Sequence, residues 1–199
     1  MRYLSRSGRW AWLAAGLLLG CYLSNFWPST PLHAVSTDRA DGITIATGVV
    51  SGEVEAFFFL DAQTGMLRAA VPSKFKGGGF QATWECNLNV DLATVIGTVN
   101  TAIKAQNAKL PGGSKRPEVQ FPQTKKFMMV TGMLDIRQGP ARLQPARSLV
   151  YVAEANTGVV LGYMLPWLET AHAGNQPFRQ QMVLWVADQL ATAVVPPGE

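Results

Sequence analysis

Histidine and cysteine, the side chains that most often serve as bases, nucleophiles or metal ligands near neutral pH, are scarce in this sequence. The chain of 199 residues has 2 His and 2 Cys. A zinc site takes three or four Cys, His or carboxylate ligands, and a Ser-His-Asp triad would need one of these histidines. Glu169 and His172 would meet on a helix, but they follow Pro166 and Trp167 in an expected loop, so we interpret them as a solvated pair. The sequence thus predicts no catalytic residue, no metal site and no cofactor.

The two cysteines lie in different contexts. Cys21 belongs to an apolar stretch, and residues 18–21 are similar to a lipoprotein signal in which Cys21 would carry the lipid. Cys86 follows Trp84 and Glu85 in a strand-like run. We interpret Cys86 as a small buried hydrophobe rather than a nucleophile.

Two strand-turn-strand segments, residues 55–65 and 148–158, match each other without a gap. Both carry an acid, a polar turn and a Thr-Gly pair, which is typical of a hairpin whose glycine takes a positive φ. The two acids could be read as an acid/base pair, but carboxylates at hairpin turns more commonly bind local backbone amides. We therefore predict turn roles for these residues. They are Asp61, Thr64 and Gly65 in the first copy, and Glu154, Thr157 and Gly158 in the second.

The match extends beyond the hairpins. A Thr-Gly pair precedes each of them, at residues 47–48 and 131–132, and a further apolar run follows each, at 80–87 and 182–188. We expect a mainly β fold of two four-stranded antiparallel meanders, residues 43–87 and 127–199, packed as a sandwich or as propeller-like blades. Residues 179–193 have a helix as their rival interpretation, and a short strand is expected at 192–195.

The insert between the meanders, residues 88–126, holds the expected helix and a basic loop. Leu92 and residues spaced from it by three and four indicate a helix that starts at an Asp91 N-cap and ends near Asn107. The basic residues from Lys104 to Lys126 are interpreted as a solvated loop or, alternatively, as a contact for anionic lipid, acidic glycan or an acidic partner. They are Lys104, Lys109, Lys115, Arg116, Lys125 and Lys126, against the single acid Glu118.

The N-terminus is typical of an export signal. Arg2, Arg6 and Arg9 precede the apolar residues 10–23, which would span about 21 Å as a helix and extend through residue 27. We predict a signal anchor over 1–27, a linker over 28–42 and an exported domain over 43–199. Cleavage after residue 34, lipidation at Cys21 and a buried helix of a soluble protein are the alternatives. Apart from these three arginines the chain carries 14 basic and 13 acidic residues, so no basic field favours nucleic acid.

Two resemblances rest on these motifs. The hairpins with Asp-Ala-Gln-Thr-Gly at residues 61–65 are similar to blade hairpins of quinoprotein-like β-propellers. Residues 31–38, 45–48, 58–65 and 128–132 resemble a family of uncharacterised membrane-or-secreted proteins typical of planctomycete bacteria. The resemblance implies an exported β-rich protein and no particular activity.

Function is therefore predicted by class. We expect a non-enzymatic cell-envelope protein, anchored in the inner membrane through residues 10–27 with its domain on the periplasmic side, or secreted if cleaved. It would act through protein contact, with a partner or as a homo-oligomer built on sheet edges and apolar faces. A binding module for anionic glycan or lipid through residues 104–126 is the alternative, and a hydrolase or oxidoreductase is the third class. Of the three tryptophans Trp84, Trp167 and Trp185, we expect most to lie in the core.

Overall fold

The structure is a computed structural model that describes residues 16, 37–40, 42–111, 115–134 and 144–191. The chain divides into two units, Met1–Ala34 and Val35–Glu199, and the second holds every element discussed below. Apart from residue 16, the predicted signal anchor with Cys21 lies outside the described residues, as do most of the linker and the short strand expected at 192–195. None of the helices described is both long and apolar enough to cross a membrane.

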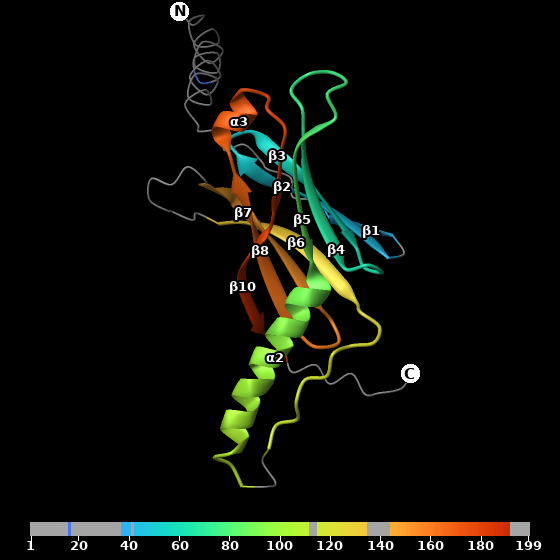
Figure 1. Cartoon of the computed structure of the whole chain (residues 1–199), viewed down its shortest axis with the longest axis vertical. Helices are drawn as coiled ribbons and strands as arrows, with labels where there is room; N and C mark the ends of the chain where they lie inside the picture. The colour runs from blue at the N-terminus through green and yellow to red at the C-terminus, as the bar shows by residue number, and fades with distance from the viewer. Residues whose placement is uncertain (1–15, 17–36, 41, 112–114, 135–143, 192–199) are drawn as a thin grey trace, which may run out of the picture. The chain divides into compact units, whose positions relative to one another are not determined.

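The domain is mainly β, as predicted, and its strands form two sheets within the described residues (Figure 1). The larger sheet has six strands in the order β1-β2-β3-β4-β5-β9, and the smaller has four in the order β10-β8-β7-β6. The larger contains β1 (Thr37–Ala40), β2 (Ile43–Ser51), β3 (Val54–Asp61), β4 (Met66–Pro72), β5 (Phe80–Asn87) and β9 (Phe178–Gln181). The smaller contains β6 (Phe127–Met133), β7 (Gln144–Glu154), β8 (Val159–Trp167) and β10 (Val183–Gln189).

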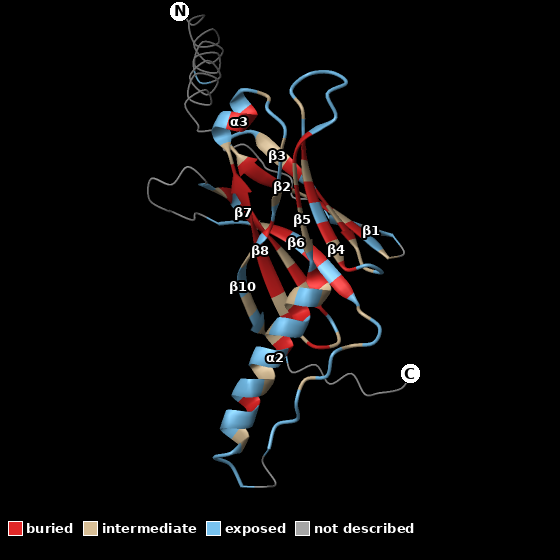
Figure 2. Ribbon diagram, in the orientation of Figure 1, coloured by how far each residue is buried: buried red, intermediate tan, exposed pale blue. Residues whose placement is uncertain are grey.

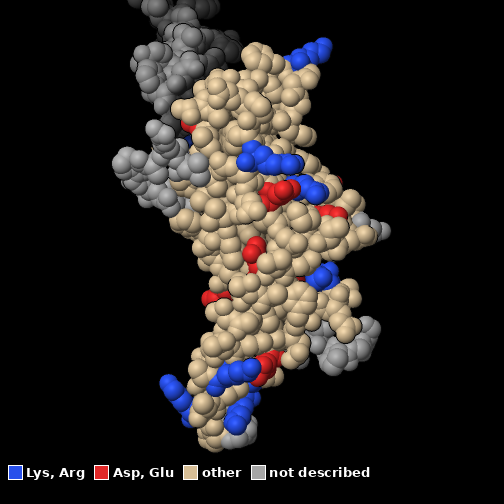
Figure 3. Space-filling model, in the orientation of Figure 1, with Lys and Arg blue, Asp and Glu red and all other residues tan. Residues whose placement is uncertain are grey.

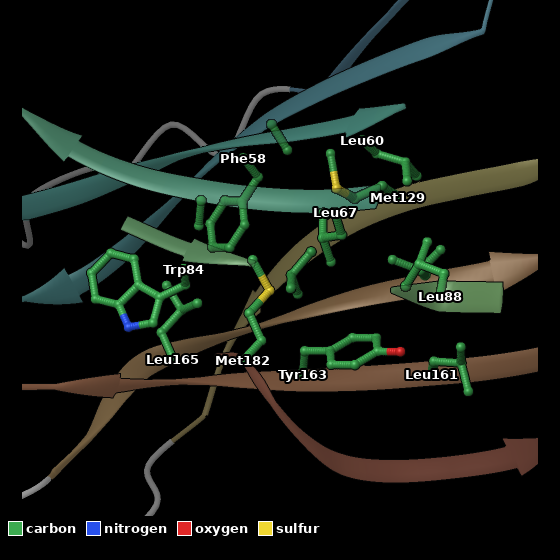
Figure 4. Close-up of a cluster of buried hydrophobic side chains, with 14 of the residues drawn as sticks. Phe58, Leu60, Leu67, Trp84, Leu88, Met129, Leu161, Tyr163, Leu165 and Met182 are labelled. Atoms are coloured by element: carbon green, nitrogen blue, oxygen red, sulfur yellow. The ribbon is translucent and has the colours of Figure 1, made fainter. Parts of the chain in front are cut away.

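Alternating side chains build the core between the two sheets. In β3, Ala56, Phe58 and Leu60 are fully buried, whereas Phe57 between them points outward and is exposed. Figure 4 shows Phe58 on one sheet facing residues such as Tyr163 on the other. The burial colouring of Figure 2 follows this alternation along the strands. Each sheet thus buries one face and leaves the other outward.

The larger sheet departs from the prediction, because it has six strands rather than four. The meander β2-β3-β4-β5 is present, but β1 pairs with β2 at one edge and β9 adds parallel to β5 at the other. The smaller sheet is the predicted antiparallel set of four strands. Residues 179–193 are not helical where described. They form β9 and β10, which belong to different sheets, and the buried Met182 lies between them.

The strand register is the same around both hairpins. Thr47 lies opposite Phe57 in one sheet, and Thr131 lies opposite Val150 at the matching place in the other. The strands that precede the two hairpins, β2 and β6, also contact each other, because the Thr131 hydroxyl donates to the Thr47 carbonyl over 2.5 Å. A side chain at Gly48 would meet the Ser148 hydroxyl at 2.9 Å, so the glycine permits this close approach.

Helix α2 (Leu88–Asn107) follows β5 directly and ends at the predicted residue. Its start was wrong in the prediction, because Asn87 is the N-cap instead of Asp91 and accepts a hydrogen bond from the Asn89 amide. The first turns bury Leu88, Leu92 and Ile96 in the core, and the later turns extend beyond the sheets (Figure 1). A second helix, α3 (Glu169–Ala173), follows β8.

Candidate functional site

His172 is buried in α3 and is not part of a solvated pair. Its Nδ1 lies 3.0 Å from Gln81 Oε1, and the Gln81 amide nitrogen donates to carbonyls that include those of Ala171 and Gln176. Because Gln81 Oε1 can only accept a hydrogen bond, His172 Nδ1 carries the imidazole proton. Burial, with the nearby Lys74 charge, lowers the pKa of His172 below 6.5. The imidazole is therefore neutral and structural.

Glu169 binds other partners than His172. Its Oε2 accepts from Trp167 Nε1 over 2.7 Å and from the Ser51 hydroxyl over 2.9 Å. These two bonds lower the pKa of the Glu169 carboxyl. Among the described residues no three His, Cys, Asp or Glu side chains gather as a metal site would require. The histidine region thus offers packing and hydrogen bonding instead of acid/base chemistry.

Cys86 matches its interpretation as a small hydrophobe. Its sulfur lies 3.8 Å from that of Met182, and burial first, with the Asp91 charge second, raises the pKa of the thiol to about 12. The thiolate that a nucleophile requires is therefore negligible near neutral pH. Beside it, the Tyr163 hydroxyl donates to Asp91 Oδ2 over 2.7 Å and ties α2 to β8.

The two turn acids both bind their own hairpins. Asp61 Oδ1 accepts from the amides of Gln63 and Thr64. Hydrogen bonding with the Thr64 side chain first, and with the Thr64 amide second, lowers the pKa of the Asp61 carboxyl. Glu154 is 1% exposed and accepts from the Thr157 amide and hydroxyl, each over 2.8 Å, and from the Lys126 amide over 3.0 Å. Neither carboxylate is placed as a general acid or base.

The predicted basic loop forms part of an arm, which we define as residues 97–107 of α2, residues 108–111 and the returning residues 115–126. Two asparagines of the helix clamp the returning chain. Asn100 exchanges two hydrogen bonds with the backbone of Val119, and Asn107 does the same with Arg116. Ile103 is 2% exposed, so the arm has its own small apolar interior.

The arm brings several of the predicted basic residues together but leaves them with different partners. Lys104 pairs with Glu118 over 3.3 Å, and Arg116 donates to Gln189 over 3.3 Å. Lys125 lies over the Phe121 ring, 5.4 Å from its centroid. Figure 3 shows Lys and Arg side chains gathered at the far end of the arm. Lys109 and Lys115 are exposed and have no partner in the part of the chain described.

The outer side of the four-stranded sheet carries a surface that we call the apolar face. Its residues are aligned by the strand register into two rows across all four strands. Met128 and Val130 are each 51% exposed and Val186 is 47% exposed. The rows are Val130, Tyr151, Gly162 and Val186, and Met128, Ala153, Val160 and Asp188.

The sequence predicted an association surface only in general terms. Trp84 and Trp167 are core, with ring centroids 6.1 Å apart, while Trp185 is 41% exposed beside the apolar face. Alternation in β6, with Phe127 and Met129 inward, was the signal that could have identified the face from the sequence. No protein-family model, curated protein or solved structure matches the chain.

Proposed function

We propose that the chain is a non-enzymatic cell-envelope protein that acts by protein–protein contact through the apolar face. The supporting observation is the pair of aligned rows in which Asp188, at the sheet edge, is the one charged side chain. The largest contiguous apolar patch of a soluble monomer covers about 300–600 Å² and is often functional. The N-terminal arginines and apolar run support the envelope location.

A second copy of this chain is the partner we propose. The face is nearly uncharged, so two copies can meet across a two-fold axis without burying like charges against each other. Four strands about 4.8 Å apart, each contributing about 13 Å along the two rows, give each copy roughly 250 Å² of face. Two such faces bury less surface than a stable dimer needs, so we expect a weak, reversible dimer.

The test is the concentration dependence of mass for the full chain in solution or detergent. We expect a monomer–dimer equilibrium that Val130→Lys weakens at least about tenfold, because a lysine would be buried without a partner. Val90→Lys is the matched control, since Val90 is 61% exposed on α2. A strict monomer at high concentration, or equal effects of both variants, would contradict the proposal.

The envelope location has its own test. Reporter fusions after Pro72 should be active only for the exported reporter. An active cytoplasmic reporter with an inactive exported one would contradict it.

The second candidate function is binding of an anionic glycan or lipid by the arm. It is favoured by the two hydrogen bonds between Asn107 and Arg116, which bracket the exposed Lys109 and Lys115 in the sequence. Replacing both by Gln should reduce binding to heparin or anionic vesicles, and salt should weaken binding by the unchanged chain because exposed charges are screened. Unchanged binding in the double variant would exclude the arm.

A further inference from the structure

The outer side of the six-stranded sheet has a hollow that the apolar face does not include. Strand register places Phe57, Ala70, Thr83 and Arg179 in one row, and Phe59, Arg68 and Glu85 in the next. Ala70 and Thr83 are small, while their neighbours are large, so the sheet is hollowed above them. The hollow has a volume of about 300 Å³, and Phe80 at its rim is 60% exposed.

The volume sets the size of an occupant. Water takes about 30 Å³ per molecule in the liquid, so the hollow holds roughly ten non-hydrogen atoms. The lining is mostly apolar, with Phe57, Phe59 and Phe80 as its aromatic walls. One ring or one branched aliphatic group with a short polar tail fits this space and these walls.

The charges set the polarity of the tail. Arg68 and Arg179 both line the hollow, with Glu85 as the one acid among the lining residues. Arg68 lies 3.9 Å from Glu85, and both side chains are 40% exposed or more, so that pair is weak. A carboxylate can therefore recruit Arg68 as well as Arg179, and an ammonium group would meet an excess of positive charge.

We propose that this hollow binds a small carboxylate with an aromatic or branched aliphatic body. The body lies over Ala70 between the phenylalanines, and the carboxylate lies toward Arg179 and Arg68. The site is on the other sheet from the apolar face, so it stands independently of the proposed dimer.

The probe for this site is 3-phenylpropanoate, with roughly eleven non-hydrogen atoms, added to the full chain and followed by saturation-transfer NMR. A ligand of this size should bind with a Kd on the order of 1 mM. The alcohol of the same skeleton should bind about five-fold more weakly, and the amine more weakly still. The preference for the acid should shrink in about 0.5 M salt.

Two variants localise the binding. Ala70→Leu fills the hollow from an outward position and should reduce binding of acid and alcohol at least about tenfold. Arg179→Gln should lower affinity for the acid about three- to five-fold and leave the alcohol unchanged, with Lys109→Gln as the control. Absence of acid binding, equal binding of acid and alcohol, or full binding by a folded Ala70→Leu chain would overturn the proposal.

Discussion

The two hairpin turns have the same backbone conformation but lie in different environments. Gly65 and Gly158 have φ of +70° and +68°, and each amide donates to the carbonyl of its turn acid. Asp61 caps its turn at the surface with two local amides. Glu154 is longer, is buried, and also holds the Lys126 amide where the arm joins β6. The same turn chemistry thus serves local geometry in one sheet and long-range docking in the other.

The largest effect should come from Glu154→Ala. It leaves the Thr157 amide and hydroxyl and the Lys126 amide without their acceptor in a buried place, which should cost about 2–4 kcal/mol of unfolding free energy. Asp61→Ala, the matched control at the exposed turn, should change stability much less. Urea unfolding at neutral pH measures both. Equal losses would show that burial of the second turn contributes nothing.

The glycines should differ in the same direction. Alanine at either position is strained by the positive φ, at about 1 kcal/mol or more. At Gly158 a Cβ would also meet the backbone carbonyl of Ala191, whereas at Gly65 it would meet the Asn89 side chain, which can rotate away. Gly158→Ala should therefore lower the thermal midpoint more than Gly65→Ala. The reverse order would contradict this reading of the two turns.

His172 should make the stability of the domain depend on pH, so the turn variants should be compared at neutral pH. The folded-state pKa of His172 lies below the value of 6.5 that the imidazole has in the unfolded chain. At a pH between the folded-state and unfolded-state pKa values, the unfolded chain therefore binds more protons than the folded chain. The unfolding free energy should show no loss from His172 above about pH 6.5 and should fall as the pH drops below this value. Thermal unfolding from pH 8 to pH 5 measures this slope, and His172→Gln should flatten it. A slope unchanged in that variant would assign the titration to another group.

The smallest effect belongs to the Asp61 carboxyl. Its folded pKa is below 3.8, so its contribution is present above that value and lost as pH falls through the folded pKa. Asp61→Asn should therefore lower the unfolding free energy slightly near pH 7, where the ionised carboxyl contributes, and make no difference well below pH 3.8, where that contribution is already lost. A difference as large in acid as near neutrality would mean that the side chain does more than cap its turn through its charge.

The hairpins and α2 could be predicted because their signals are local. Alternating apolar residues, Thr-Gly turns and a helical spacing each lie within a short stretch of sequence. β9 gave no such signal, since Phe178–Gln181 is short and polar, and it is a strand only because β5 offers a parallel edge. Asn87 both ends β5 and caps α2, so the helical spacing of apolar residues does not reveal it as the cap.

The candidate surfaces were harder to predict. Alternation alone turns Phe57 and Phe59 outward, but the hollow needs Ala70, Thr83 and Arg179 from three further strands. The Asn100 and Asn107 clamps are seven residues apart on the helix and bind a segment whose path the sequence does not specify. Pairing between distant segments is therefore what the sequence leaves undetermined.

The passage of the chain through Met182 has a consequence for how the domain folds. The Met182 amide donates to Glu85 in the larger sheet, and the next residue, Val183, pairs with Met164 in the smaller one. β9 and β10 therefore cannot both reach their edges until each sheet has formed. Their docking should be a late step of folding, because it requires the closure of long loops, which costs conformational entropy. Since one short segment is shared, the sheets should unfold together in a single transition.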